Sequence, residues 1–232
     1  MRTFLRALTF VLAPILLSAA PPTTGVEGTV HDLSITGQNS VTMATKSCVF
    51  CHTVHNSSAS AGSKLIPDWN HTTTAATFTM YNNTNHAGAD LKGTVDSQPT
   101  GPSLACLSCH DGTVSVGSLV VAPLGGGNDI YVSARGGVSP GTGRISSGNA
   151  LVGTDLSNDH PISITYQDNL DTGLQPAASL TGVRLYPTNV TGAKVQCSSC
   201  HDVHNYGSAG TTAPFLRATM VGSFLCRTCH KK

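Results

Sequence analysis

The sequence predicts a mostly irregular fold with short β-strands and few short helices. Only 11% of the 232 residues are charged and 5% are aromatic, whereas 24 are glycine and 12 are proline. Together with serine, threonine and asparagine, these residues favour turns over long helices. The apolar fraction of 39% allows a core. With so few aromatic residues, however, much of the interior has to be something other than side chains.

The first 20 residues have the pattern of a secretory signal peptide. Arg2 and Arg6 form a basic start, residues 7–17 a short apolar run, and residues 18–20 a small-residue end. The run is too short to cross a bilayer, and cleavage is expected between residues 18 and 25. We therefore expect a secreted protein, extracellular or at the cell surface, without a transmembrane segment. The periplasm is the alternative location.

The charge balance excludes one class of partner. Without Arg2 and Arg6, the 13 basic residues fall to 11, against 12 acidic residues. A chain this neutral does not attract nucleic acid by charge. The sequence also has no phosphate loop or nucleotide fingerprint. We therefore expect no nucleic acid partner and see no separate catalytic constellation.

Four Cys-x-x-Cys-His motifs dominate the chain and use all eight cysteines. Such a motif attaches haem: the two thiols add to the two vinyl groups of one haem, and the histidine is held under the iron. Paired Cys-x-x-Cys knuckles can also bind zinc, but zinc does not require a histidine directly after the second cysteine. We predict four covalently bound c-type haems. The attaching cysteines are Cys48, Cys51, Cys106, Cys109, Cys197, Cys200, Cys226 and Cys229, and the proximal ligands are His52, His110, His201 and His230.

The motifs form two related units. Residues 48–56 and 197–205 share the pattern Cys-x-x-Cys-His-x-Val-His-Asn, and each copy is followed by a simpler motif. The predicted organisation is a lead-in at 21–47, a first paired haem unit at 48–110, a Gly/Ser-rich insert at 111–196 and a second paired haem unit at 197–232. Alternating or β-rich patterns predict short strands at 76–81, 113–121, 130–133, 162–166, 183–186 and 193–196.

Six further histidines can fill the opposite axial positions. Because methionine is scarce after the signal, we expect two histidines on every iron and correspondingly low potentials. The leading distal ligands are His55, His71, His160 and His204, with His31 and His86 in reserve.

The surroundings of each candidate set its alternatives. His55 and His204 lie three residues after a proximal histidine, where each can meet the iron of a haem packed alongside, or else bind a propionate. Pro161 holds His160 at the start of an extended segment. His71 follows the only tryptophan and could instead be an ordinary surface histidine. His31 could be solvated in a flexible lead-in.

With these motifs, the chain resembles the doubled Cys-x-x-Cys-His multihaem c-type cytochromes. More narrowly, it resembles the extracellular tetrahaem filament cytochromes of metal-reducing bacteria. The resemblance implies a loop-dominated fold wrapped around four stacked haems. In related filament cytochromes, a histidine three residues beyond an early motif binds a haem of the neighbouring subunit. That role falls here on His55, with His31 as the alternative. The resemblance is carried by residues 31–34, 48–55, 69–71, 106–112, 158–161, 197–204 and 224–230.

The expected function is electron transfer, not enzymatic catalysis. An exported tetrahaem protein, polymerised into an extracellular filament, would carry electrons by haem-to-haem hopping from redox partner cytochromes to external acceptors such as metal oxides. A monomeric periplasmic shuttle is one alternative. Another is a multihaem reductase with one open haem site, which a wholly low-spin spectrum would count against.

Overall fold

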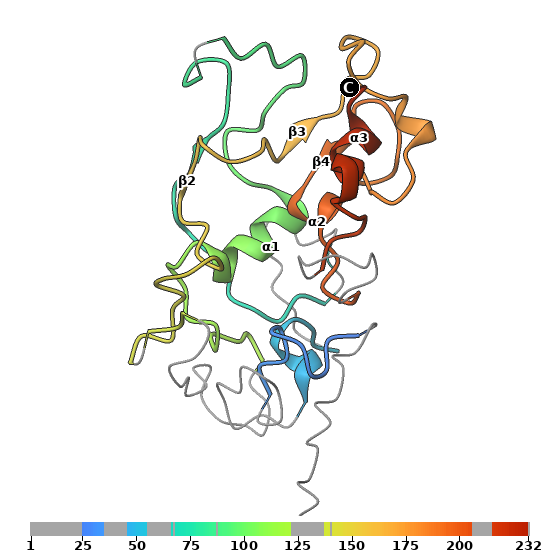
Figure 1. The fold of residues 1–232 in the computed structure, drawn as a ribbon. Helices are drawn as coiled ribbons and strands as arrows, with labels where there is room; N and C mark the ends of the chain where they lie inside the picture. Colours follow the sequence, from blue (N-terminus) through green and yellow to red (C-terminus); the bar gives the residue numbers. More distant parts are fainter. Residues whose placement is uncertain are drawn as a thin grey trace, which may run out of the picture.

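The computed structural model describes residues 25–34, 46–54, 66, 68–86, 88–121, 137–139, 141–205 and 215–231. Over these ranges most of the chain is irregular, and its regular elements are short (Figure 1). The helices are α1 (Gly101–His110), α2 (Cys197–Cys200) and α3 (Phe224–Cys229), and 3-10 turns occur at Ser47–Phe50, Ala177–Ser179 and Val221–Ser223. The expected loop-rich class with few short helices and short strands is confirmed.

The strands pair segments that are distant in sequence. β1 (Thr79–Met80) lies parallel to β2 (Asp155–Leu156), with Thr79 opposite Asp155. β3 (Ile164–Thr165) lies antiparallel to β4 (Lys194–Val195), with Ile164 opposite Val195. The insert is therefore joined to the first unit through β1 and β2, whereas β3 and β4 both lie in the insert and β4 leads into the second unit.

Three of the six strand predictions were right in place but too long. The predicted strands at 76–81, 162–166 and 193–196 each contain a two-residue strand, and 183–186 retains only a bridge from Tyr186 to Lys194. The prediction at 113–121 was wrong apart from a bridge between His71 and Leu119. There, Ser118 N–H donates to the Ser115 carbonyl at 2.9 Å, so the backbone turns around Gly117. The segment 130–133 lies outside the described residues.

Apolar side chains in the described ranges gather in four small clusters. The largest includes Tyr166, Leu180 and Leu185. The second cysteine of a motif packs against each of three clusters: Cys229 against this one, Cys109 and Cys51 against two others. The clusters therefore hold the motifs in place. No helix in the described ranges has both the length and the apolar character needed to cross a membrane.

Candidate functional site

Each Cys-x-x-Cys-His motif forms a single helical turn. The N–H of His52 donates to the Cys48 carbonyl at 2.8 Å, and His201 and His230 make the same bond to the first cysteines of their motifs at 3.1 and 2.9 Å. His110 is the last residue of α1. Residues three apart lie on one face of a helix, so the two thiols of each motif share a face. One planar group can therefore reach both thiols and the adjoining histidine.

Local sequence fixes where these turns begin. Pro102 lies in the first turn of α1, where its missing N–H costs nothing. Gln196 caps α2 in a capping box, since its side chain and that of Ser199 each bond the other's backbone N–H. α2 contains only the turn from Cys197 to Cys200. Capping thus stabilises a helix that is too short to form by propagation alone.

The motifs succeed one another in space in their chain order. Cys51 and Cys109 are electrostatic neighbours, Cys106 is hydrogen-bonded to Cys197, and Cys200 has Cys226 and Cys229 as neighbours. α1 contacts α2 (Figure 1). The first motif therefore adjoins the second, the second the third, and the third the fourth.

All eight cysteines are free thiols in this structure. Burial raises the pKa of Cys51 and of Cys109 to about 12 and that of Cys229 to about 11. The hydrogen bond from Cys106 lowers the pKa of the Cys197 thiol to about 7. Among the described residues, no group of three or more His, Cys, Asp or Glu side chains is arranged to hold a bare metal ion.

Three proximal histidines face a second histidine from elsewhere in the chain. The ring centroids are 6.0 Å apart for His110 and His31, 6.2 Å for His52 and His204, and 6.4 Å for His230 and His160. The partners come from the lead-in, the second unit and the insert, respectively. Three separate chain segments thus deliver an imidazole to an attachment motif.

These separations match those of two imidazoles on one iron. A bond from a first-row metal ion to an imidazole nitrogen is about 2 Å long. The ring centroid lies roughly 1 Å behind that nitrogen, since the ring bonds are about 1.4 Å long. Two rings on opposite faces of one iron therefore have centroids about 6 Å apart. The residues present fit a haem iron between each pair.

Hydrogen bonds prepare two of these rings for ligation. His110 Nδ1 lies 2.7 Å from the Ala150 carbonyl, and His160 Nδ1 lies 3.0 Å from the Pro161 carbonyl. A carbonyl accepts only from a protonated nitrogen, so each contact places the proton on Nδ1 and leaves a lone pair on Nε2. Metal-bound histidines are oriented in this way by a carbonyl on the second nitrogen.

His31 lies in a fixed turn rather than a solvated lead-in. The Asp32 carboxylate accepts hydrogen bonds from Gly28 N–H and from the Ser34 hydroxyl, at 2.8 and 2.5 Å. The His31 and Phe215 rings pack edge to face, with their centroids 4.6 Å apart. Its Nδ1 is buried without a hydrogen-bond partner, and burial lowers the pKa of His31 to about 4. The ring is therefore neutral, the form that binds iron.

His71 takes a different position from the other candidates. It is almost fully buried, with Nδ1 2.8 Å from the Thr72 carbonyl and Nε2 2.9 Å from the Ser115 carbonyl. Nε2 also lies 3.5 Å from Cys109 Sγ. The structure thus brings His71 beside a cysteine of the second motif, while His31 stands opposite His110.

Three candidates remain: His86 and His55, which are distal candidates, and His201, which is a proximal one. The His86 ring stacks on Tyr81 with centroids 4.1 Å apart and contacts the Ser157 carbonyl. His55 lies outside the described residues. His201, the fourth proximal candidate, has no facing histidine ring at a comparable distance in the described part of the chain. Burial lowers its pKa, and the nearby His110 lowers it further.

Two residues that support the motifs were missed by the sequence analysis. Asn70 is almost fully buried, and its Nδ2 donates to the Val49 carbonyl at 2.6 Å within the first motif. Arg217 Nε donates to the Ser198 carbonyl at 2.8 Å within the third motif, and its Nη1 binds Asp202 at 2.9 Å. A polar residue between Trp69 and His71 was the available signal for Asn70. Arg217 had none.

No protein-family model matches the chain, and no curated protein matches it. The geometry of the motifs and of the histidine pairs therefore carries the functional argument.

Proposed function

We propose that this chain is a tetrahaem c-type cytochrome that transfers electrons. One observation carries the proposal: three of the four attachment motifs present their histidine to a second histidine at 6.0 to 6.4 Å between ring centroids. That is the spacing of two axial ligands on one iron. When bound, each haem supplies reversible one-electron chemistry.

In this proposal the chain's residues attach, ligate and orient the haems. The eight cysteines form the thioether bonds. The axial pairs are His52 with His204, His110 with His31, and His230 with His160. The carbonyls of Ala150 and Pro161 hold the protons of His110 and His160 on Nδ1. Paired neutral imidazoles favour low potentials compared with a histidine and methionine pair.

The order of the motifs supports a continuous path for electrons. Neighbouring cysteines link the first motif to the second, the second to the third and the third to the fourth. The first and fourth motifs lie at the surface, because Cys48 and Cys226 are exposed. Electrons would therefore cross the protein in motif order, with the first and fourth motifs as the ends accessible to partners.

We assign the fourth distal position, opposite His201, to His55 from the same chain or from a neighbouring subunit. A ligand from a neighbour would make the protein a homopolymer, the extracellular filament expected from the resemblance, that delivers electrons to metal oxides. A ligand from the same chain would favour a periplasmic shuttle. If no histidine takes this position, the haem at His201 has an open site, as the reductase alternative requires.

The test is the purified protein after expression with a haem-attachment system. We expect four haems per chain by haem absorbance against protein mass, no free thiols, and a wholly low-spin spectrum in the assembled state. A chain that retains titratable thiols and binds no haem contradicts the proposal. Electron microscopy then separates filaments from monomers, and carbon monoxide binding to the reduced protein reports an open site.

A further inference from the structure

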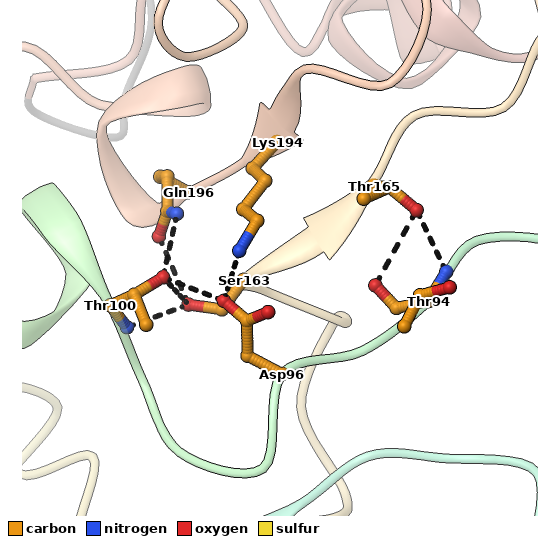
Figure 2. Close-up of polar contacts among 7 residues, drawn as sticks. All are labelled: Thr94, Asp96, Thr100, Ser163, Thr165, Lys194 and Gln196. Carbon is orange, nitrogen blue, oxygen red and sulfur yellow. Dashed lines mark hydrogen bonds and ion pairs between the residues drawn. The ribbon is translucent and has the colours of Figure 1, made fainter.

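A polar network joins the two haem-binding units where α1 and α2 begin (Figure 2). Its members are Asp96 and Thr100 ahead of α1, Ser163 in the insert, and Lys194 and Gln196 ahead of α2. Their side chains meet in a region that includes fully buried Ser163 and Gln196, which is 2% exposed. Buried polar groups are costly unless bonded to one another, so the arrangement is tightly specified.

Ser163 bridges the first residues outside both helices. Its hydroxyl donates to Gln196 Oε1 at 3.1 Å and accepts from Thr100 N–H at 3.0 Å. Thr100 is the N-cap residue of α1, and Gln196 is that of α2. The Ser163 hydroxyl therefore links the two helix starts, beside a direct bond from Gln196 Nε2 to Thr100 Oγ1 at 3.5 Å.

An ion pair reinforces the bridge. Lys194 Nζ contacts Asp96 Oδ2, and the Thr100 hydroxyl donates to the same carboxylate oxygen at 2.8 Å. The Lys194 and Asp96 side chains are 33% and 24% exposed. A partly buried pair with an added hydrogen bond is more constrained than a pair in free solvent. Asp96 and Lys194 thus connect the first unit to β4.

The helices fixed in this way carry the second and third attachment motifs. Cys197 N–H donates to Ser103 Oγ at 2.9 Å, one helical turn before Cys106. Cys106 is itself hydrogen-bonded to Cys197. The first cysteines of the two motifs are therefore neighbours. Cys197 directly follows Gln196 of the network.

We propose that this network is a positioning device that sets the separation of the second and third haems, and with it their pairwise redox interaction. The inference rests on the proposed function and identifies Ser163, Asp96 and Lys194 as positioning residues. The electrostatic interaction between two redox centres depends on their separation. At this junction, polar bonds hold the start of α1 against the start of α2.

The test compares variants of the haem-loaded protein. Ser163→Ala removes the bridging hydroxyl without changing charge. The double variant Asp96→Asn/Lys194→Met removes the ion pair without changing net charge, and it serves if Ser163→Ala does not fold. The matched control is Thr165→Val. Thr165 Oγ1 accepts from Thr94 N–H at 2.7 Å, which joins the segment ahead of α1 to the insert away from the helix starts.

The measurement is a redox titration followed by paramagnetic NMR, which resolves the haems individually. Interacting centres titrate as a coupled set. We expect Ser163→Ala and the double variant to lose much of the pairwise interaction between the second and third haems while keeping four haems. In these variants, the interactions between haems of the same unit should match those of the parent protein. In Thr165→Val, all pairwise interactions between haems should match those of the parent. Lys194→Arg, which keeps a cation beside Asp96, should retain the parent interaction.

Two results overturn the inference in distinguishable ways. If the parent protein contains no haem, the proposed function fails, and this inference fails with it. If the variants keep four haems and an unchanged interaction between the second and third, only the positioning role fails. An equal loss in Thr165→Val would show a general loosening of the junction and would also overturn the assigned role.

Discussion

Replacing His160 with alanine tests the histidine pairs most directly. The His160 ring centroid lies 6.4 Å from that of His230, so under the proposed function His160→Ala would remove one of two axial ligands from one haem in four. Cys226, Cys229 and His230 remain to hold that haem. We expect about a quarter of the haem to become high-spin in the oxidised protein and to bind carbon monoxide when reduced.

The structure predicts that this substitution spares the fold. His160 is exposed, and its ring nitrogen Nδ1 lies 3.0 Å from the carbonyl of the adjoining Pro161. Exposed substitutions of this kind change the free energy of unfolding by about 0.5 kcal/mol or less. Electron paramagnetic resonance and visible spectra of the intact protein are therefore the assay. His160→Met should restore a low-spin centre with a raised potential.

The matched control is His86→Ala, which removes a histidine whose ring stacks on Tyr81. We expect its spectrum to remain wholly low-spin with four haems. A low-spin His160→Ala protein would refute the pairing of His160 with His230. A high-spin haem in His86→Ala would show that His86 is a ligand and that the 6 Å criterion selects the wrong rings.

Three further predictions concern stability, acid and assembly. Asn70→Ala leaves the Val49 and Val121 carbonyls without their bonds to Nδ2, and should lower the free energy of unfolding by about 3 kcal/mol, measured by thermal denaturation against Thr165→Val. Burial lowers the pKa of His31 to about 4 from 6.5, so the unfolded chain takes up this proton first, and an iron bound to the ring would oppose protonation of the folded chain further. Stability should fall as pH drops from 6.5 towards 4, with a shallower slope in His31→Gln. His55→Ala should abolish filaments seen by electron microscopy while keeping four haems, and intact filaments would exclude an inter-subunit His55.

Local features of the site were predictable from sequence because the chemistry is contained in five consecutive residues. A Cys-x-x-Cys-His motif has to form one helical turn for both thiols to share a face. Gln196 and Ser199 show how neighbouring residues stabilise such a turn in α2. The loop-rich class followed from composition, since frequent turn residues interrupt every longer element.

The partner of each proximal histidine depends on contacts that no local pattern encodes. His31 reaches His110 because Asp32 fixes its turn and Phe215, from the second unit, packs against its ring. His71 seemed better placed beside tryptophan, yet carbonyls of Thr72 and Ser115 contact both of its ring nitrogens. A neutral imidazole has only one N–H to donate. One of these two contacts therefore lacks a proton. The ring nitrogen without a proton lies beside a carbonyl that it cannot bond.

The histidine pairs also connect parts of the chain that lie far apart in the sequence. His31 with His110 joins the lead-in to the first unit, His52 with His204 joins the two units, and His160 with His230 joins the insert to the second unit. Each apolar cluster is small, and a motif cysteine packs against each of three clusters. An iron bound between each pair would close a contact that side chains alone hold weakly. Because ligand binding to the folded state adds to its stability, haem attachment and folding should be one coupled process in this protein.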